Sequence, residues 1–164
     1  MPAAVRGVLD LRNWDFTQHS LLKLDGEWEF CPGRSINPSD FAQGENRKGC
    51  GFIQVPGLWR GRTVNGLVIP GEGAGTYRLK ILSGPDKKAK VLILHRVFSA
   101  YSLWINGALV DTRGRIDRNS NVAEDYIFVH NRRYYSFTPE EGDNEIVLQV
   151  FNYGHGSGGI DRSI

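Results

Sequence analysis

The residues with the clearest chemical potential lie in the glycine-rich run Gly154-His-Gly-Ser-Gly-Gly159. Its spacing matches GxGxxG, the pattern of dinucleotide-binding turns, in which a helix after the glycines holds a pyrophosphate. Few residues follow the run before Ile164, too few for that helix or for a second parallel strand. Ser157 also lacks the leading glycine of the GxSxG nucleophile elbow. We therefore expect a loop at the edge of a ligand site.

The remaining acid, base and metal-ligand candidates form no catalytic pattern. The histidines are widely scattered, without HExxH or cysteine spacing for zinc: His19, His95, His130 and His155. Glycosidic chemistry needs two carboxyl groups facing one bond at about 5 to 9 Å, a geometry that sequence neighbours such as Asp25 and Glu27 do not establish. The sequence predicts a domain that is not an enzyme, with no cofactor and no metal. An autonomous enzyme remains a minor alternative.

Composition favours an ordered domain and argues against some partners. Hydrophobic residues make up 40% of the chain and the net charge is +2, so no strong field attracts nucleic acid, and nucleic acid is not an expected partner. The basic run Arg113–Arg118 is interrupted by Asp117 and favours a solvated loop. There is no apolar run long enough to span a membrane and no export leader. The abrupt start at Met1–Ala4 suggests a part of a longer protein.

Strand patterns run along the whole chain. Tyr77–Ile81 alternates polar and apolar residues and is expected to be half exposed, whereas Val91–Leu94 and Ile146–Val150 are apolar on both faces and are expected to be central. Further strands are expected at Leu21–Phe30, Phe52–Val55, Ala100–Ile105, Leu109–Thr112, Tyr126–Val129 and Tyr134–Phe137. Short strands at this spacing predict an all-β fold, an antiparallel β-sandwich or barrel, formed as one domain over residues 1–164.

The connections carry their own signals. Asn106-Gly107 tolerates positive φ at both positions and predicts a type I′ hairpin within Trp104–Val110. The stretch Val55–Gly75 is rich in glycine and proline and predicts a long loop over an end or edge of the sandwich. A helix of one or two turns is expected at Pro38–Gln43. Cys31 and Cys50 lack CxxC spacing, and either a disulfide or two unpaired thiols fits the sequence.

A succession of short motifs resembles the galactose-binding-like jelly roll. In order, the motifs are Leu24-Asp-Gly-Glu-Trp-Glu-Phe30, Val55-Pro-Gly-Leu-Trp59, Gly75-Thr-Tyr-Arg-Leu79, Ala100-Tyr-Ser-Leu-Trp-Ile-Asn-Gly107 and Val150-Phe-Asn-Tyr-Gly-His155. Two relatives share it: the N-terminal sugar-binding domain of family 2 glycosidases, and the extracytoplasmic sensor domain of bacterial receptors with seven transmembrane helices. The Gly-Thr-Tyr-Arg, Ala-Tyr-Ser-Leu-Trp-Ile-Asn-Gly and Asn-Tyr-Gly-His segments look more like the receptors.

The resemblance to the receptors implies a sensor outside the cytoplasmic membrane, periplasmic or extracellular. Its parent would be a cyclase, histidine kinase or phosphatase, and would meet the membrane only through its C-terminal transmembrane region. The expected partner is a small molecule or a carbohydrate, and the oligomeric state is open. Tyr153 and Gly154 depart from the usual Asn-Phe-x-His pattern, which puts the ligand in doubt more than the fold. The alternative is an accessory domain beside a glycosidase active site.

A sugar site in such a sandwich needs an aromatic face and planar polar groups for vicinal hydroxyls. The residues of these types at positions that match the family motifs are Trp59, Arg78, Tyr101, Asn152 and His155. We expect several of them to converge at one end of the sandwich, where the Val55–Gly75 and Gly154–Gly159 loops form the rim.

Most of these side chains also have a structural explanation. Tryptophan more often fills a sandwich core than binds a ligand, and this applies to Trp59. Arg78 can equally pair with a carboxylate inside the fold, and Asn152 can satisfy backbone groups of a loop. His155 is the strongest single candidate, because its flanking glycines should leave it accessible.

Overall fold

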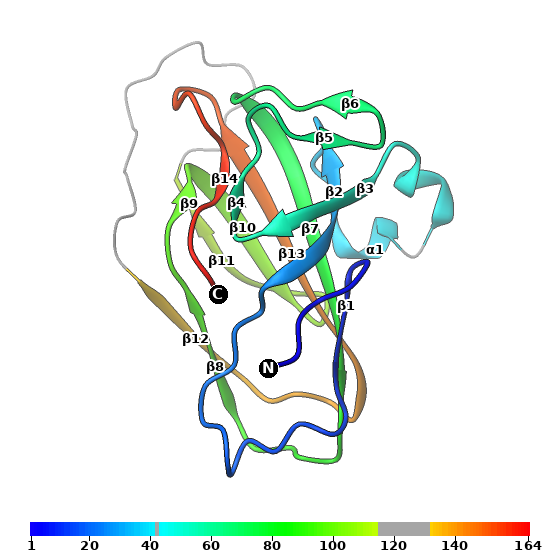
Figure 1. The fold of residues 1–164 in the computed structure, drawn as a ribbon, viewed down its shortest axis with the longest axis vertical. Helices are drawn as coiled ribbons and strands as arrows, with labels where there is room; N and C mark the ends of the chain where they lie inside the picture. The colour runs from blue at the N-terminus through cyan, green and yellow to red at the C-terminus, as the bar shows by residue number, and fades with distance from the viewer. Residues whose placement is uncertain (42, 115–131) are drawn as a thin grey trace.

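Two layers of β-strands face each other in the computed structural model, which describes residues 1–41, 43–114 and 132–164 (Figure 1). The strands are β1 (Val8–Leu11), β2 (Gly26–Pro32), β3 (Gly51–Val55), β4 (Gly57–Leu58), β5 (Thr63–Val64), β6 (Leu67–Val68), β7 (Gly73–Ser83), β8 (Lys90–Leu94), β9 (Val97–Phe98), β10 (Ala100–Ile105), β11 (Ala108–Arg113), β12 (Arg133–Phe137), β13 (Gly142–Asn152) and β14 (Gly159–Ile160). The helical segments are α1 (Pro38–Phe41) and a 3-10 turn at Gly44–Arg47.

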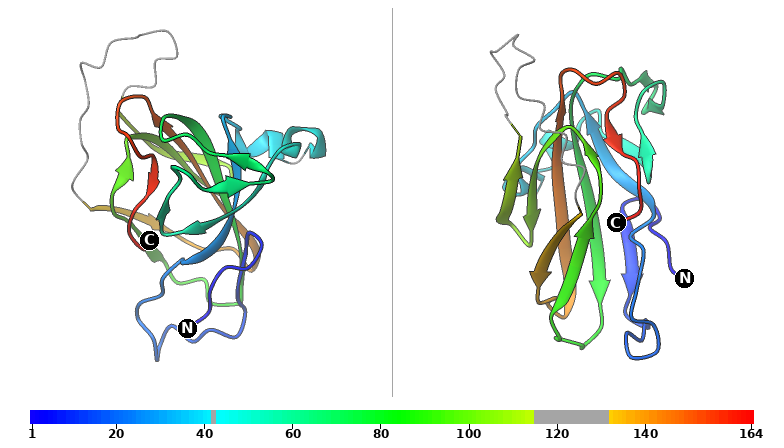
Figure 2. Two further views of the ribbon diagram at one scale, coloured as in Figure 1. Left: turned by 45° about the horizontal axis from the view of Figure 1, so that its top comes forward. Right: turned by 90° about the vertical axis from the view of Figure 1, so that its left-hand side faces the viewer.

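The larger layer is a sheet built around two long strands. Its order is β11-β10-β13-β7-β2-β3, all antiparallel, and β1 adds a short parallel pairing to β7. Strands β7 and β13 pair along their whole length, from Gly73 opposite Asn152 to Ser83 opposite Gly142. Figure 2 shows these two strands side by side from two further directions. These two paired strands extend along the large sheet and connect the two ends of the sandwich.

The second layer consists of smaller pieces. Strand β8 pairs with β12, β14 lies between β4 and β9, and β5 pairs with β6. Alternate residues of the large sheet point toward this layer and are buried there, among them Trp28, Phe30, Tyr77, Leu79 and Leu148. These aromatic and aliphatic side chains supply most of the burial that stabilises the fold. The expected antiparallel β-sandwich is confirmed.

A covering segment, residues 33–41 and 43–50, lies over the opposite face of the large sheet. Phe41 and Ile36 are buried there against Val147. The side chain of Gln149 donates to the carbonyl of Ile36 at 2.9 Å, which fixes the segment to β13. A disulfide between Cys31 and Cys50 closes the segment at its end. The cysteine pairing that the sequence left open is therefore a disulfide.

Loss of this disulfide should cost about 3 kcal/mol of unfolding free energy, because the closed loop restricts the unfolded chain. The two cysteines are 19 residues apart, and Cys31 is fully buried. The double variant Cys31→Ala/Cys50→Ala should unfold at a lower urea concentration than the oxidised protein. Addition of a reductant should shift only the unmodified protein. Equal urea midpoints for the variant and the oxidised protein would contradict this expectation.

The predicted hairpin is present as the β10–β11 turn. Asn106 and Gly107 have φ values of 49° and 77°, the pair of positive angles that a type I′ turn requires. The Asn106 side chain also accepts a hydrogen bond from the backbone N–H of Glu145 at 2.8 Å, which ties the turn to β13. The short helix was also located correctly, although α1 ends at Phe41.

Three expectations about strands were wrong. The Tyr77–Ile81 segment is not half exposed. It lies in the central strand β7, and its polar Arg78 is buried because the covering segment lies over it. Val91–Leu94 lies in β8, whose Val91 is 58% exposed, because β12 is the one strand that pairs with β8 in the described part of the chain. The expected Leu21–Phe30 strand begins only at Gly26.

The breaker-rich stretch Val55–Gly75 is not purely loop, since it contains β4, β5, β6 and the start of β7. The strands it holds before β7 are only two residues long each, so the stretch still runs as a connection. Two other expectations, the strand at Tyr126–Val129 and the loop continuing to Arg118, lie outside the described residues.

Candidate functional site

Two connecting segments meet at the end of the sandwich drawn at the top of Figure 1. The carbonyl of Gly71 accepts hydrogen bonds from the Trp59 indole N–H at 2.8 Å and from the Asn152 amide at 2.6 Å. The same amide donates to the carbonyl of His155 at 2.7 Å. Asn152 thereby joins the 55–75 connection to the 153–159 loop, as the sequence analysis expected of these two segments.

Close packing under this end requires glycine at one position. A Cβ atom at Gly158 would overlap the Trp59 indole ring. Trp59 is 1% exposed and packs beside Phe30 and Tyr77, with its ring nearly parallel to that of Tyr77. Trp59 is therefore a core side chain that positions both loops, in agreement with the structural explanation that the sequence left open.

The rim of this end, made of Arg60, Tyr153, His155 and Gly156, is more accessible. His155 is partly exposed and stacks on Phe98, with ring centroids 4.3 Å apart. Its Nδ1 atom lies 2.9 Å from the carbonyl oxygen of Ser157. Arg60 donates to the carbonyl of Gly156 at 3.2 Å, and the ring of Tyr153 is 53% exposed. The 153–159 loop thus carries an exposed aromatic residue and a partly exposed imidazole, and a guanidinium group bonds to its backbone.

Arg78 lies away from this rim, beneath the covering segment. Its guanidinium donates to Glu145 at 2.6 Å and to Glu29 at 3.1 Å, and it packs against the Phe41 ring. Glu29 also accepts from Arg47 at 2.7 Å. The Arg78 side chain is 10% exposed. This arrangement matches the alternative of an ion pair inside the fold.

Tyr101 is also separate from the rim and is 1% exposed. Its hydroxyl lies 2.8 Å from that of Tyr135, which donates to Asp111 at 2.8 Å. Burial raises the pKa of the Tyr101 phenol, and burial with these hydrogen bonds raises the pKa of Tyr135 above its usual range. Both phenols therefore stay neutral, and the chain of hydroxyl groups links β10, β12 and β11.

The structure thus brings together three of the five predicted ligand residues, Trp59, Asn152 and His155. Asn152 is fully buried and, like Trp59, has its polar atoms bonded within the protein. Of these three residues, His155 alone is partly exposed. A role for the five residues in ligand binding remains a prediction.

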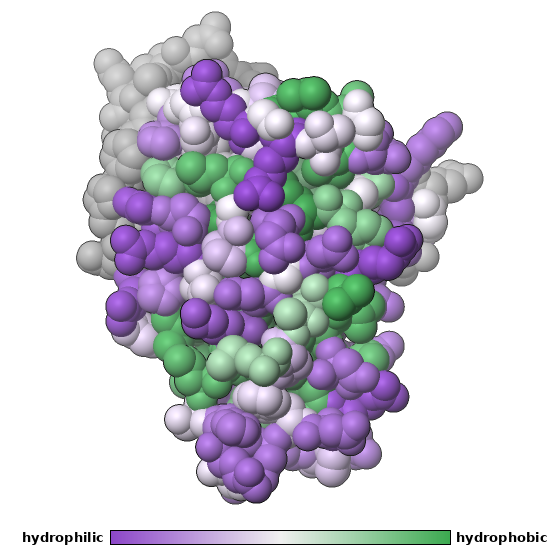
Figure 3. Space-filling model, viewed as in Figure 1, coloured by the Kyte–Doolittle hydropathy of each residue, from purple (hydrophilic) through white to green (hydrophobic). Residues whose placement is uncertain are grey.

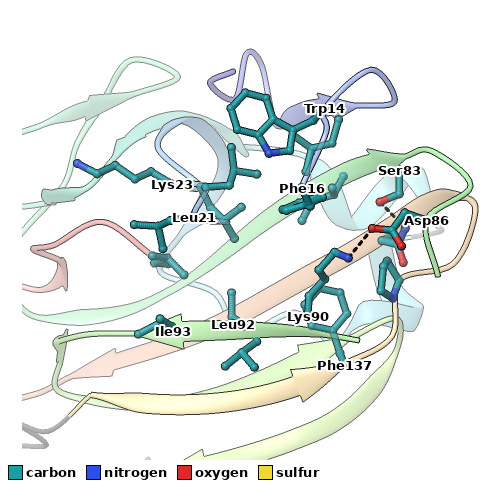
Figure 4. Close-up of a pocket in the computed structure, with 18 of the residues that line it drawn as sticks. Trp14, Phe16, Leu21, Lys23, Ser83, Asp86, Lys90, Leu92, Ile93 and Phe137 are labelled. Atoms are coloured by element: carbon teal, nitrogen blue, oxygen red, sulfur yellow. Dashed lines mark hydrogen bonds and ion pairs between the residues drawn. The ribbon is translucent and has the colours of Figure 1, made fainter. Parts of the chain in front are cut away.

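Sequence reasoning missed a pocket at the opposite end of the molecule, between the 11–24 segment and β8 (Figure 4). Its volume is about 340 Å³, within the usual range of small-molecule sites. The lining is mostly apolar and includes Trp14, Phe16, Leu21, Leu22, Leu92, Ile93 and Phe137. Figure 3 shows apolar surface in the lower left part of the molecule, over β8. None of the five predicted residues lines this pocket.

A weak signal for the pocket was present in the sequence. The segment 11–24 contains Trp14, Phe16, Leu21 and Leu22 but forms no strand after Leu11. Such a concentration of apolar residues outside regular structure needs a surface to pack on. The sequence alone does not show that β8 provides this surface, because the pairing of β8 with β12 is non-local.

His95 lines the pocket, and the stability of the domain should depend on its neutral form. Burial lowers the pKa of the imidazole below its ordinary value of 6.5, and the charges of Arg132 and Arg162 add to this effect against Asp161. The unfolded chain then binds the proton more readily, so this stability is present above about pH 6.5 and is lost as the pH falls below it. The variant His95→Gln should lose less unfolding free energy between about pH 7 and about pH 5. Urea unfolding at several pH values would show this, and parallel curves would contradict it.

Within residues 1–41, 43–114 and 132–164, no group of three or more His, Cys, Asp or Glu side chains is placed to hold a metal ion. In the same residues, no helix has the length and apolar character that crossing a membrane would require.

Comparison with known proteins places the fold. No family model and no curated protein matches the sequence. The structure is similar to a β-glucuronidase from an uncultured Clostridium, with a TM-score of 0.58 and 17% identity over 85% of this chain and 27% of that one. It is also similar to a family 2 glycosyl hydrolase member from Bacteroides cellulosilyticus, with a TM-score of 0.61 and 17% identity over 87% of this chain and 20% of that one.

A third similar structure is the Ruminococcus gnavus β-glucuronidase in complex with D-glucuronic acid, with a TM-score of 0.56, 13% identity and coverage of 87% of this chain and 28% of that one. The chain therefore spans between a fifth and just over a quarter of these enzymes. At such identities the likeness concerns the fold alone: this chain has the galactose-binding-like β-sandwich that also occurs as one part of family 2 glycosidases.

Proposed function

We propose that this chain is a non-catalytic module that recognises a carbohydrate for a larger protein. The observation that carries the proposal is the meeting of the 55–75 connection and the 153–159 loop, where Asn152 binds both backbones. Loops held at one end of a rigid sandwich are the usual place for recognition. The fold shared with a part of family 2 glycosidases supports a carbohydrate as the ligand class.

The rim has the chemistry that a sugar ring requires. Tyr153 offers an exposed aromatic face for the apolar side of a pyranose, and Arg60 and His155 bring planar polar groups to the same rim. Trp59 and Asn152 act beneath the rim as positioning residues. The guanidinium group of Arg60 would favour a sugar acid such as D-glucuronic acid, the ligand in the Ruminococcus gnavus complex.

The parent protein can use such a module in two ways. In the sensor reading, the module lies outside the cytoplasmic membrane and passes a conformational bias to transmembrane helices. The Cys31–Cys50 disulfide supports this placement, because disulfides persist mainly in oxidising compartments. In the second reading, the module is an accessory domain of a glycosidase, and the shared fold with a part of such enzymes favours it.

Calorimetry with a panel of neutral sugars and sugar acids tests the carbohydrate proposal. The variants Tyr153→Ala and His155→Ala should each weaken the binding of a ligand from this panel at least tenfold, since each removes one face of the site. Tyr134→Ala, which removes a 62% exposed tyrosine from β12, is the matched control and should bind normally. Unchanged affinity in both rim variants would exclude the rim as the binding site.

The gene sequence beyond Ile164 distinguishes the two readings of the parent. Seven apolar segments, each long enough to span a membrane, would support the receptor. A long soluble sequence that encodes further sandwich and barrel domains would support the glycosidase and exclude the receptor.

A further inference from the structure

We propose that the pocket between the 11–24 segment and β8 binds a small amphiphilic anion, a molecule with an apolar ring or chain and one carboxylate. This site differs from the carbohydrate rim, which lies at the opposite end of the sandwich (Figure 1). An experiment can therefore contradict the proposal for one site and leave the proposal for the other intact.

The shape of the pocket suits the apolar part of such a molecule. Figure 4 shows Trp14 and Lys23 on one wall, Leu92 and Ile93 on the facing wall, and Phe137 near Lys90 at one end. Leu92 is buried, Ile93 and Phe16 are partly exposed, and Leu21 is 62% exposed. An apolar ligand would cover the exposed parts of these side chains and gain the free energy of their burial. A free monosaccharide would leave its hydroxyl groups without partners along these walls.

Donor groups and positive charge are present around the pocket. The indole N–H of Trp14 is buried and has no acceptor among the described residues. Lys23 is exposed, and none of the ion pairs in the described part of the chain involves it. The ammonium group of Lys90 lies 4.6 Å above the Phe16 ring and 2.8 Å from Asp86. A carboxylate would complement these donors and this positive charge.

The lining charges agree with an anion rather than a cation. Three cationic side chains border the pocket, Arg12, Lys23 and Lys90, against one acidic side chain, Asp86. Arg12 is already paired with Asp10, and Lys90 with Asp86. Lys23 therefore supplies the positive charge that remains for a ligand; its side chain lies on the Trp14 side of the pocket and extends away from the indole ring (Figure 4).

Calorimetry with naphthalene-2-carboxylate as the probe tests the proposal. Its two fused rings match an apolar pocket of this size, and its carboxylate provides the acceptor. The carboxylate should bind at least threefold more tightly than neutral naphthalen-2-ylmethanol, the gain expected from one partly exposed charge pair. D-glucuronate, an anion without an apolar body, should not compete.

Variants locate the probe. Ile93→Trp should fill the pocket and abolish binding, whereas Val110→Trp, a substitution on the exposed part of β11, should leave it unchanged. Lys23→Gln should remove the preference for the carboxylate over the alcohol, and Lys87→Gln, an exposed lysine outside the lining, should keep it. Thermal unfolding of each variant confirms that it is folded. His155→Ala should bind the probe normally, which separates this site from the carbohydrate rim.

Three results would overturn the proposal. Equal affinity of the carboxylate and the alcohol would remove the anion as the ligand class. Unchanged binding to folded Ile93→Trp would place the probe elsewhere. Absence of binding together with a dimer that Ile93→Trp disrupts in sedimentation experiments would identify the pocket as an interface between two copies of the chain.

Discussion

Replacement of Arg78 by alanine should lower the free energy of unfolding by about 3 to 5 kcal/mol, the usual cost of removing one partner from a buried ion pair. Arg78 is the shared partner of Glu29 and Glu145, and the Glu29 side chain is only 8% exposed. Without the guanidinium group, the carboxylate of Glu29 remains buried, and Arg47 is its one remaining ion-pair partner among the described residues. Urea unfolding measures the loss.

The matched control for this prediction is Arg12→Ala. Arg12 also pairs with a carboxylate, but it and its partner Asp10 have side chains 61% and 48% exposed. Solvent screens such a pair, so its removal should destabilise the protein far less than removal of Arg78. Equal losses of unfolding free energy in Arg78→Ala and Arg12→Ala would show that the ion pairs of Arg78 with Glu29 and Glu145 do not stabilise the fold. Arg78 would then again be a candidate ligand residue.

Replacement of Trp59 by alanine should cost about 3 to 5 kcal/mol, because it leaves a large cavity beneath both loops of the carbohydrate rim. The indole ring contacts Phe30 and Tyr77, and its N–H bonds to Gly71. The same variant should weaken carbohydrate binding, since Gly71 then loses one of its two hydrogen-bond donors. Urea unfolding and calorimetry measure the two effects.

Two control variants distinguish a residue that supports the loops from a residue that contacts the sugar. Tyr153→Ala removes an exposed ring and should change the free energy of unfolding by less than about 0.5 kcal/mol while it weakens sugar binding. Trp59→Phe keeps an aromatic ring but loses the hydrogen bond to Gly71, and should lie between the alanine variant and the unmodified protein. A Trp59→Ala variant as stable as Tyr153→Ala would contradict the core position of this residue.

Local sequence patterns predicted turns and strands more reliably than they predicted which strands are buried and which residues pair across the fold. The Asn106-Gly107 turn follows from backbone sterics alone, and it was located correctly. The burial of β7 was not predictable, because the covering segment that hides Arg78 lies far away in the sequence. The cysteine pairing was equally open, since it depends on how the covering segment folds back over the sheet.

The candidate site was predictable only in part. The sequence identified the two segments that meet at the rim, because their glycines and prolines exclude long strands. It could not distinguish Trp59 and Asn152, which hold the rim from below, from His155, which reaches the surface. The apolar pocket was missed because its two walls, the 11–24 segment and β8, are brought together only by the tertiary fold.

The most direct test of carbohydrate recognition at the loop end is an NMR titration of the ¹⁵N-labelled domain with the sugar or sugar acid that binds most tightly in calorimetry. Binding at the rim predicts saturable shift changes concentrated in the amides of residues 56–72 and 153–159, with no conversion of the sugar. Shift changes centred on the covering segment or on β11, or turnover of a glycoside by the isolated domain, would contradict the account.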